Sequence, residues 1–393
     1  MELKQPAFFP GKVLGIVAEY DPFHRGHERH LSLAKEQVRP DFTYVVLSGC
    51  FKQRGELAML SPYDRARCAL AAGADAVFAL PAAWTVRDAE HYALGAVSLL
   101  HRLGITHLAF GAESESLEAM EKIAELLENP TDGFQEALHR RLKAGAGYPR
   151  AVSQALEEIN PVWAEIMNQP NNILAICYLR AILRLDAQIQ PVLIPRQGGY
   201  HADRIEPEQP SASALRGALE RGNYVPAYQA MTAESARLLR KALLNSTLPR
   251  REALDMLLIG RLRSMTREDI QALPYVSEGL EDLILSAARK VQTREQLLDM
   301  VSGKRYPKAR ISRICAWALL GLKPEELEAE RLPEQAILLG LRDKPEMTAL
   351  WRDKKNLITT SWTNETDIKA WQLWAQCAVL PDVYPWKEKV VRL

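Results

Sequence analysis

Residues 13–27, VLGIVAEYDPFHRGH, decide the fold that this sequence predicts. They begin with a short apolar run at 13–18, and its β-branched residues favour a buried strand. A loop follows, and the tetrapeptide HRGH (24–27) then opens a segment, about 26–37, that is predicted to be helical. A loop between a strand and a helix is a natural phosphate site, because the helix N-terminus offers free N–H groups and a positive dipole end.

The two histidines of this tetrapeptide are candidate catalytic residues. His24 and His27 are separated by a tight turn, so both imidazoles can face one anionic group. Gly26 removes the side chain at the point where a nucleotide must approach the backbone. Two histidines in a polar surface turn are the alternative, since a four-residue pattern arises by chance. Their position at the first junction between a strand and a helix favours the catalytic interpretation.

Strand-like and helix-like segments alternate through the first 112 residues. After the first pair, strands are predicted at 44–48, 76–80 and 107–111, and helices at 62–72 and 88–103. This alternation predicts an α/β protein with a Rossmann-like, parallel, doubly wound sheet. Ligands of such sheets bind beyond the carboxyl ends of the strands. Polar or glycine-bearing segments lie at three of those ends, at 19–27, 48–56 and 111–113.

The rest of the chain is predicted to be mainly helical. Residues 1–230 are expected to form the sheet domain, with a helical insertion at about 114–190 and a further strand at 191–195. Residues 231–393 are expected to form a mainly helical C-terminal domain. A chain of 393 residues is long enough for two domains.

Apolar runs and cysteine usage indicate the cellular compartment in which the protein is found. No apolar run approaches the roughly 20 residues that a membrane span needs, and the first residues lack the apolar core of a signal peptide. The five cysteines are scattered and never form a C-x-x-C pair, which favours a reducing compartment and argues against a cysteine-rich metal site. We therefore expect a cytoplasmic protein with no membrane partner. The net charge of +1 neither indicates nor excludes a nucleic-acid partner, because binding depends on where basic residues cluster.

A second motif lies about 185 residues after the histidines. Ser211, Ser213 and Arg216 stand at a predicted helix start, where serine caps are common. Hydroxyls and a planar guanidinium suit the β- and γ-phosphates of a nucleotide. An ordinary capped helix is the alternative. In combination with the histidine motif, the phosphate-binding interpretation is favoured, because a triphosphate must be held from two sides.

The two motifs together resemble the nucleotidyltransferase superfamily that carries the HIGH motif, which includes class I aminoacyl-tRNA synthetases. A narrower resemblance, to the bacterial tRNA(Met) cytidine acetate ligase family, runs from about Leu14 onward. It rests on seven segments in order and spacing: GIVAEYDPFHRGH, LSGCFKQRGE, FGAES, QPNNIL, PSASALR, SEGLE and GKRYPKARISR.

This resemblance implies a reaction in two steps. ATP and acetate give acetyl-adenylate and pyrophosphate, and the acetyl group then passes to the exocyclic amine of the wobble cytidine in elongator tRNA(Met), forming N4-acetylcytidine. ATP, acetate and this tRNA are thus the implied partners, with Mg²⁺ carried by the nucleotide phosphates and no metal ligands assigned to the protein. Residues 1–230 would be the ATP-binding domain, and residues 231–393 a candidate tRNA-binding domain.

The family's functional positions carry over residue by residue. The catalytic candidates are His24, His27 and Arg216. The implied ATP-binding residues are Ile16, Val17, Ala18, Glu19, Tyr20, Asp21, Pro22, Phe23, His24, Arg25, Gly26, His27, Glu28, Arg29, Gly111, Asn171, Asn172, Arg196, Gln197, Ser211 and Ser213. The chain departs from the usual family pattern at four positions: Asp21, Arg25, Cys50 and Gln197.

Two segments of this set have a structural alternative. Residues 53–56, QRGE, could line the acetate or cytidine pocket, or form a turn fixed by an ion pair between Arg54 and Glu56. Asn171 and Asn172 could contact ATP, or cap the apolar helix that follows Pro170.

Basic residues cluster twice in the C-terminal half. The candidate tRNA-binding residues are Lys304, Arg305, Lys308, Arg310 and Arg313. Within the helix predicted there, Arg310 and Arg313 share a face, while Ile311 and Ile314 turn toward the core. A second cluster comprises Arg237, Arg240, Lys241, Arg250 and Arg251. A solvated surface is the alternative for both, and Tyr306, which could stack on a base, is more typical of packing.

Two other functions remain open on the sequence alone. A small-molecule adenylyltransferase would use the same nucleotide motifs, although such enzymes rarely carry about 160 further residues of helical, locally basic chain. A non-catalytic RNA-binding relative is the other alternative, and the intact histidine pair and Ser/Arg motif argue against it. An aminoacyl-tRNA synthetase is disfavoured, because no K-M-S-K-S-like loop follows the sheet.

Overall fold

The alternating apolar segments of the first half build the centre of one sheet. The computed structural model describes residues 11–196, 205, 210–277, 279–322, 332–381, 384–385 and 388–393. Within these residues the sheet has the order β5-β4-β1-β2-β3-β6-β7, and β8 also pairs with β6. The strands are β1 Val13–Ala18, β2 Phe42–Ser48, β3 Ala76–Leu80, β4 His107–Ala112, β5 Gln190–Pro195, β6 Ala336–Leu341, β7 Ile358–Thr359 and β8 Val391–Arg392.

The pairing pattern confirms the predicted Rossmann-like sheet. Strands β5, β4, β1, β2 and β3 form a run in which each strand is parallel to the next. The predicted strand at 13–18 is matched residue for residue, and the others differ by at most two residues at one end. The first helices of the sheet layer are α1 Arg25–Val38, α2 Pro62–Ala71, α3 Ala82–Thr85 and α4 Ala89–Leu103.

Side chains of successive strand residues point to opposite faces, so each face of the sheet has its own core. Leu14 and Ile16 of β1 join the cluster that packs α1 and α2, whereas Val13 joins the one that packs α4. The central strands β2 and β3 are buried at every residue because helices cover both faces, as expected for a parallel sheet.

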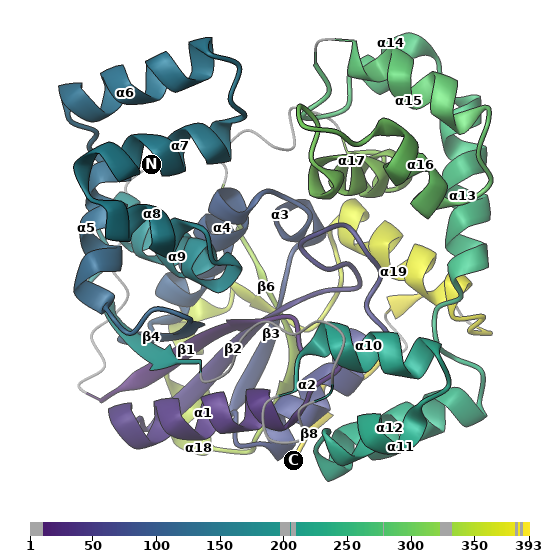
Figure 1. Cartoon of the computed structure of the whole chain (residues 1–393). Coiled ribbons are helices and arrows are strands. Elements are labelled where there is room, and N and C mark those ends of the chain that lie inside the picture. The colour runs from purple at the N-terminus through teal and green to yellow at the C-terminus, as the bar shows by residue number, and fades with distance from the viewer. Residues whose placement is uncertain are drawn as a thin grey trace.

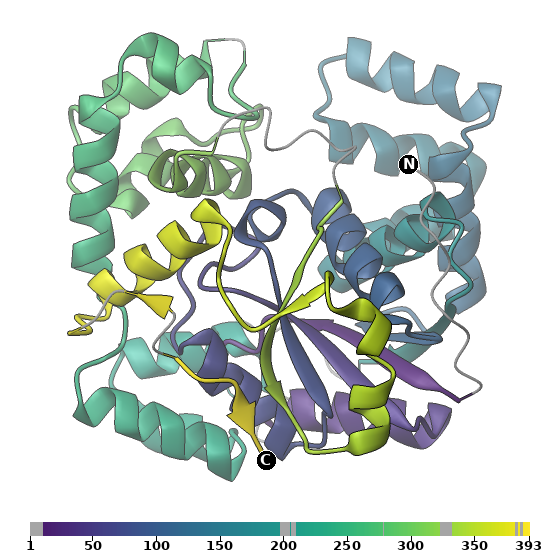
Figure 2. The same cartoon turned by 180° about the vertical axis from the view of Figure 1, so that it is seen from behind.

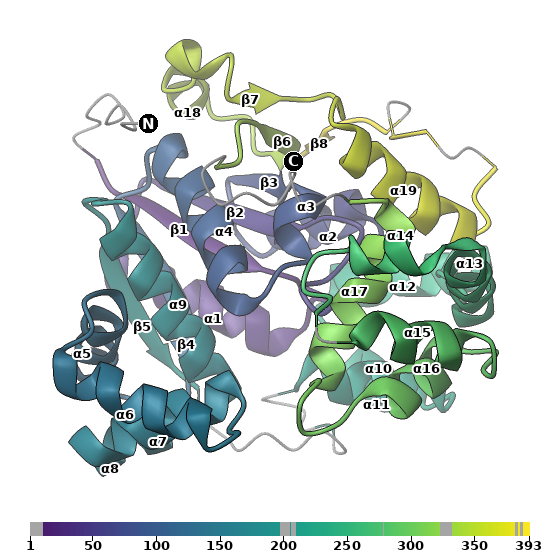
Figure 3. The same cartoon turned by 90° about the horizontal axis from the view of Figure 1, so that it is seen from above.

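Two helical lobes stand on the same side of the sheet (Figures 1 and 3). The insertion lobe follows β4 and confirms the predicted helical insertion. It comprises α5 Leu117–Glu128, α6 Asp132–Lys143, α7 Tyr148–Ile159, α8 Pro161–Met167 and α9 Pro170–Arg184. The C-terminal lobe has a core of its own. It comprises α13 Arg251–Ser264, α14 Arg267–Gln271, α15 Leu280–Ala288, α16 Arg294–Val301 and α17 Lys308–Leu320.

Shorter helices connect these parts. After β5 come α10 Ala212–Glu220, α11 Tyr224–Gln229 and α12 Ala233–Leu244, which lie beside α1 and α2 (Figure 1). The last α-helices of the described residues are α18 Pro345–Ala349 and α19 Glu365–Cys377.

The chain returns to the sheet near its end, which the sequence analysis did not predict. Strand β6 pairs antiparallel with β3, and Figure 2 shows it alongside the earlier strands. The run at 336–341, AILLGL, is buried at every residue. A short, continuous apolar run of this kind fits a buried strand or a helix, so periodicity alone does not separate them.

Candidate active site

A large cleft lies beyond the carboxyl ends of the parallel strands. Its volume is about 920 Å³, and its wall includes the ends of β1, β4 and β5. The first turns of α7 and α9 reach it from the insertion lobe, and the start of α17 reaches it from the C-terminal lobe. A doubly wound sheet binds its ligands at this edge. The cleft is therefore the candidate active site.

Most of the implied ATP-binding stretch lines this cleft. Its lining includes Ile16, Val17, Ala18, Glu19, Tyr20, Asp21, His24, Gly26, His27 and Arg29. Four members of the stretch do not line the cleft: Pro22, Phe23, Arg25 and Glu28. Phe23 is part of the hydrophobic core, and Pro22, which follows a cis peptide bond, is buried as well. Arg25 and Glu28 are exposed to solvent.

His24 and His27 lie at the start of α1, and reciprocal hydrogen bonds between them fix their orientation. His24 has extended backbone (φ −140°) and is the N-cap of the helix. Its Nδ1 accepts the backbone N–H of His27 at 3.3 Å, and Nδ1 of His27 accepts the N–H of His24 at 3.4 Å. The two rings stack with centroids 3.6 Å apart. A Cβ at Gly26 would lie 3.1 Å from the His24 ring, so any larger residue would push against this imidazole.

These contacts fix the protonation of the pair. Because both Nδ1 atoms accept backbone N–H groups, the hydrogen-bond pattern assigns the proton of each neutral ring to Nε2. Burial, with Arg196 and Arg216 nearby, lowers the pKa of His24 to about 3. Burial and the neighbouring His24 also hold the pKa of His27 well below its ordinary value. At neutral pH the pair is therefore uncharged and offers two N–H donors.

The Ser/Arg motif, residues 211–216, lies beside the histidine loop and contacts it through Arg216. Ser211 caps α10, as predicted, by accepting the N–H of Ala214 at 3.1 Å. The guanidinium of Arg216 donates to the backbone carbonyl of Asp21 at 2.5 Å and to Oγ of Ser213 at 3.2 Å. The structure thus brings together two motifs that lie far apart in the chain, and Arg216, Ser211 and Ser213 all line the cleft.

A second wall of the cleft comes from β4 and β5. Gly111 lies at the end of β4, and a Cβ there would meet the side chain of Arg196 at 3.4 Å. Arg196 follows β5 and lines the cleft. Gln197, the next implied ATP contact, lies outside the described residues.

The capping interpretation of the two asparagines is wrong. Both lie inside the first turn of α9, whose N-cap is Gln169. The buried amide of Asn172 accepts the N–H groups of Glu113 and Ser114 at 2.8 and 2.9 Å, so it fixes the loop after β4. Asn171 donates to Glu113 at 2.5 Å and lines the cleft, whereas Asn172 does not.

The turn at 53–56 is built on a different ion pair from the one expected. Glu56 pairs with Lys52 at 2.7 Å, and no ion pair with Arg54 is found among the described residues. Burial raises the pKa of Glu56, but the Lys52 ammonium outweighs it, so the pKa falls to about 2. Lys52 also lies 3.3 Å from the buried carboxylate of Asp21. This charged network joins the turn to the histidine loop.

The same turn docks on the C-terminal lobe. The hydroxyl of Ser312 on α17 donates to the backbone carbonyl of Arg54. Gly55 has φ +75°, and a Cβ there would come within 2.6 Å of the Ser312 carbonyl. Glycine is thus required both by conformation and by close approach. The lobe is positioned against the active site through this contact.

The basic cluster of the C-terminal lobe faces the same cleft. Lys304, Arg305, Arg310 and Arg313 line it, while Lys308 does not and instead pairs with Asp299 at 2.5 Å. As predicted, Ile311 and Ile314 are buried beneath this face, and Tyr306 packs in the core of the lobe. The second basic cluster lies elsewhere: Arg237 and Arg251 pair with Glu234 and Glu220.

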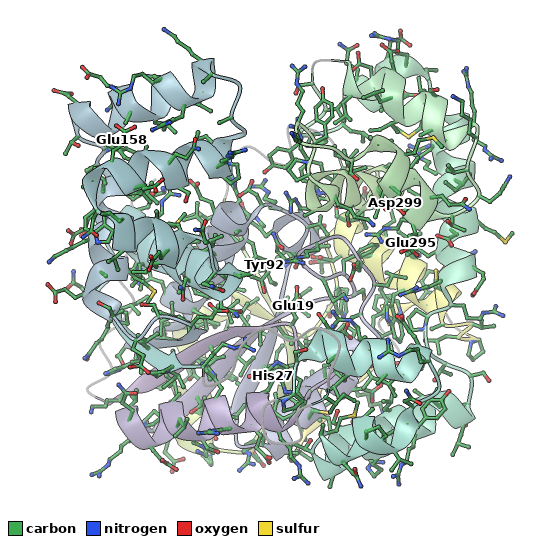
Figure 4. The ribbon with its side chains drawn as sticks, in the orientation of Figure 1. Glu19, His27, Tyr92, Glu158, Glu295 and Asp299 are labelled. Atoms are coloured by element: carbon green, nitrogen blue, oxygen red, sulfur yellow. The ribbon has the colours of Figure 1, made fainter. Side chains whose placement is uncertain are left out.

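Sequence reasoning missed several residues at the site. Arg65 of α2 is fully buried, and its guanidinium donates to the carbonyls of Glu19, Gly49 and Leu60. Tyr92 also lines the cleft. Figure 4 shows Glu19 and Tyr92 between the two lobes, with His27 below them. An arginine and a tyrosine inside amphipathic helices give no signal of their own, because only the sheet topology brings them to this edge.

The described residues include neither a candidate membrane-spanning helix nor a candidate metal cluster. Among these residues no helix combines the length and the apolar character needed to cross a membrane. Within the same residues, no three His, Cys, Asp or Glu side chains are grouped so that they could hold a metal ion.

The buried histidines predict how stability depends on pH. Burial and Arg196 lower the pKa of His30 to about 4, so His24, His27 and His30 are all neutral in the folded protein. In the unfolded chain they bind protons below pH about 6.5. The folded state is therefore favoured above that pH, and this stability is lost as the pH falls toward 4. Each histidine contributes a slope of about 1.4 kcal/mol per pH unit in this range.

Urea unfolding at pH 7, 6 and 5 measures this dependence. In the variant His30→Asn, the unfolding free energy should fall less steeply between pH 6 and 5, by about 1.4 kcal/mol per unit. Equal slopes in the variant and the unchanged protein would show that His30 is protonated alike in both states.

Comparisons with known proteins identify the family of the chain. A family model described as HIGH nucleotidyl transferase matches residues 11–380. The tRNA(Met) cytidine acetate ligase of Fervidobacterium nodosum is 34% identical over 333 residues, which cover 84% of this chain and 78% of that protein. The ligase of the same name from Syntrophomonas wolfei is 36% identical over 342 residues, which cover 84% and 82%.

Solved structures show the same fold over nearly the whole chain. The apo crystal structure of Thermotoga maritima TmcAL has a TM-score of 0.88 and 28% identity, and the match covers 97% of this chain and 99% of that one. Thermotoga maritima TmcAL bound with alpha-thio ATP has a TM-score of 0.86 at 28% identity, covering 97% and 100%. The chain therefore belongs to the HIGH nucleotidyl transferase family and, within it, to the tRNA(Met) cytidine acetate ligases.

Proposed function

We propose that this enzyme uses ATP and acetate to acetylate the exocyclic amine of the wobble cytidine in elongator tRNA(Met), forming N4-acetylcytidine. The observation that carries the proposal is the uncharged, self-capped pair His24 and His27, which meets Arg216 in a cleft that also contains the basic cluster of α17. The family names and the relative bound with an ATP analogue support it. We place the reaction in the cytoplasm, where tRNA and ATP are available.

In the first step, an acetate oxygen attacks the α-phosphate of ATP. A P–O bond forms to acetate, the bond to the β-phosphate breaks, and pyrophosphate leaves with the electron pair. Charge builds up on the leaving group, so fixed donors that face it lower the barrier. His24, His27 and Arg216 are the proposed donors, with Ser213 beside them. Neutral imidazoles suit this task, because they donate hydrogen bonds without giving up a proton.

The wall formed by β4 and β5 is proposed to hold the rest of ATP. Gly111 leaves room beside Arg196, and Asn171 lines the same side of the cleft. Mg²⁺ would bind the nucleotide phosphates and neutralise part of their charge.

In the second step, the cytidine amine attacks the acetyl carbonyl and AMP leaves. The base must be unstacked to enter the cleft, which an anticodon loop permits. We propose that residues 231–393 include the tRNA-binding part, with Lys304, Arg305, Arg310 and Arg313 near the phosphates of the loop. Lys308 is the weakest member of this set, because its ammonium is already paired with Asp299.

Lys304 offers the clearest test of the tRNA interface. It is exposed, and no partner is found for its ammonium among the described residues. Lys304→Ala is expected to weaken tRNA binding and to reduce the slope of log K against log[salt] by about 0.7–0.9. Filter binding between 50 and 200 mM salt measures both quantities. Lys355→Ala, an exposed lysine that does not line the cleft, is the matched control and should change neither. An unchanged slope for Lys304→Ala would remove this residue from the interface.

Incorporation of labelled acetate into tRNA(Met) transcripts tests the function as a whole. We expect incorporation that requires ATP and is lost when the wobble cytidine is replaced by uridine. Release of pyrophosphate with another small carboxylate, without incorporation into tRNA, would instead indicate a small-molecule adenylyltransferase.

A further inference from the structure

The carboxylates that line the cleft differ in how their oxygens are used. Asp21 and Glu56 share Lys52, at 3.3 and 2.7 Å. Glu113 accepts hydrogen bonds from the two asparagines of α9. Glu19 has one contact, because its Oε1 accepts the backbone N–H of Gln53 at 2.7 Å. Across the part of the chain that the structure describes, its Oε2 takes part in no hydrogen bond or ion pair, and the nearby Arg65 guanidinium donates to backbone carbonyls instead.

Glu19 is held firmly in this position. The Gln53 contact fixes its carboxylate, and Gln53 is itself anchored through its amide to the carbonyl of Arg87 at 2.6 Å. The backbone carbonyl of Glu19 is held by Arg65 at 2.7 Å. These contacts hold the Glu19 carboxylate in place at the wall of the cleft. Figure 4 shows Glu19 in the central space between the two lobes.

The charges that line the cleft limit which groups of a substrate can bind beside this carboxylate. Basic residues dominate the described lining of the cleft, as expected where phosphates bind. A free carboxylate repels both the phosphates of ATP and the carboxylate of acetate. Its partner must be a hydrogen-bond donor of a substrate. The substrates offer such donors at the ribose hydroxyls, the adenine amine and the cytidine amine.

The sheet order separates these donors. The proposed ATP wall, with Gly111 and Arg196, lies on β4 and β5, to one side of β1. Glu19 is tied to the other side, because Gln53 follows β2. The turn that contains Gln53 docks on α17, which carries part of the proposed tRNA contacts. The free oxygen of Glu19 thus belongs to the side of the cleft from which the tRNA base would enter.

We infer that Glu19 accepts a proton from the exocyclic amine of the wobble cytidine during acetyl transfer. The inference rests on the proposed function. The amine nitrogen forms a bond to the acetyl carbon, the bond from that carbon to the adenylate oxygen breaks, and AMP leaves with the electron pair. One amine proton passes to Oε2 of Glu19, and the product is a neutral amide. The resemblance places Glu19 in the ATP-binding stretch, and the inference assigns its side chain to the second substrate.

Two substitutions separate this role from a structural one. Glu19→Gln keeps the length of the side chain and an oxygen for the Gln53 N–H, but it cannot accept the proton. Glu19→Asp keeps the carboxylate but is one methylene shorter, so it fits Gln53 less well. A proton acceptor predicts that Asp retains more transfer than Gln, whereas an anchor for the turn predicts the reverse order.

The experiment measures each step by itself. Adenylation is followed by acetate-dependent exchange of pyrophosphate into ATP, and transfer by single turnover of supplied acetyl-adenylate with tRNA(Met) transcript. In Glu19→Gln we expect transfer to slow by about 10²–10⁴-fold more than adenylation, the range of general-base catalysis. Glu136→Gln, an exposed carboxylate on α6, is the matched control and should leave the ratio of the two rates unchanged.

Each other outcome is decisive. Equal losses in both steps would make Glu19 an ATP contact and overturn the inference. Transfer by Glu19→Gln at the rate of the unchanged enzyme would also overturn it and leave the proposed function in place. Absence of any transfer by the unchanged enzyme would instead defeat the proposed function.

Discussion

Replacing His27 with asparagine is expected to slow acetyl-adenylate formation by about 10²–10³-fold, the cost of one preorganised donor to a developing negative charge. The side-chain oxygen of asparagine can take over the acceptor role of Nδ1 toward the backbone of His24, now 3.4 Å away. The helix cap is thereby kept, while the outward N–H is lost. Acetate-dependent exchange of labelled pyrophosphate into ATP gives the rate.

Two further variants test whether the loss of the N–H donor causes this effect. His27→Gln places an N–H₂ group near the position of Nε2 and should recover part of the lost rate. His139→Asn changes an exposed histidine on α6 and should behave as the unchanged enzyme. Binding of tRNA, measured separately, should be nearly the same in all of them. Normal exchange by His27→Asn would show that the histidine pair only caps the helix.

Arg65→Met is expected to lower the free energy of unfolding by roughly 2–4 kcal/mol. The arginine is completely buried, and its guanidinium links the ends of β1 and β2 through the carbonyls of Glu19 and Gly49. Methionine fills similar volume but donates nothing, so these carbonyls lose their donor in a dry environment. The midpoint of urea unfolding measures the change. The rate of adenylation should fall as well, because the hydrogen bond that holds the backbone of Glu19, next to the histidine loop, is lost.

Arg67→Met is the matched control on the same helix. Arg67 is only partly buried, and its replacement should change the unfolding free energy by less than about 0.5 kcal/mol. An equal effect of both substitutions would mean that the strand ends do not depend on the guanidinium of Arg65.

Local signals predicted the sheet and the histidine loop well. The segment around β1 combines a β-branched strand, a glycine and a helix start within 15 residues, so its structure is decided locally. The same holds for Ser211, whose hydroxyl caps α10 within the next turn. Such contacts span three residues, and propensity and capping rules describe them directly.

Long-range partners could not be read from the sequence. Lys52 looks like a surface residue in its own segment, yet its ammonium is nearly buried between Glu56 and Asp21, which lies across the cleft edge. The ion pair between Arg54 and Glu56, one of two alternatives for this turn, is not found among the described residues, where Glu56 pairs with Lys52 and Gly55 packs on α17. Strand β6 gave no signal that distinguishes it from a helix, and only its pairing with β3 defines it.

The position of β6 has a consequence for synthesis on the ribosome. Strand β3 is complete at Leu80, but its second neighbour begins only at Ala336. Until the chain has been made as far as Leu341, the β3 edge presents unpaired N–H and C=O groups beside apolar side chains. Such an edge can pair with another nascent chain. The nucleotide-binding strands can therefore assemble early, while protection of the sheet against aggregation comes late, and chaperones that shield strand edges should matter most in that interval.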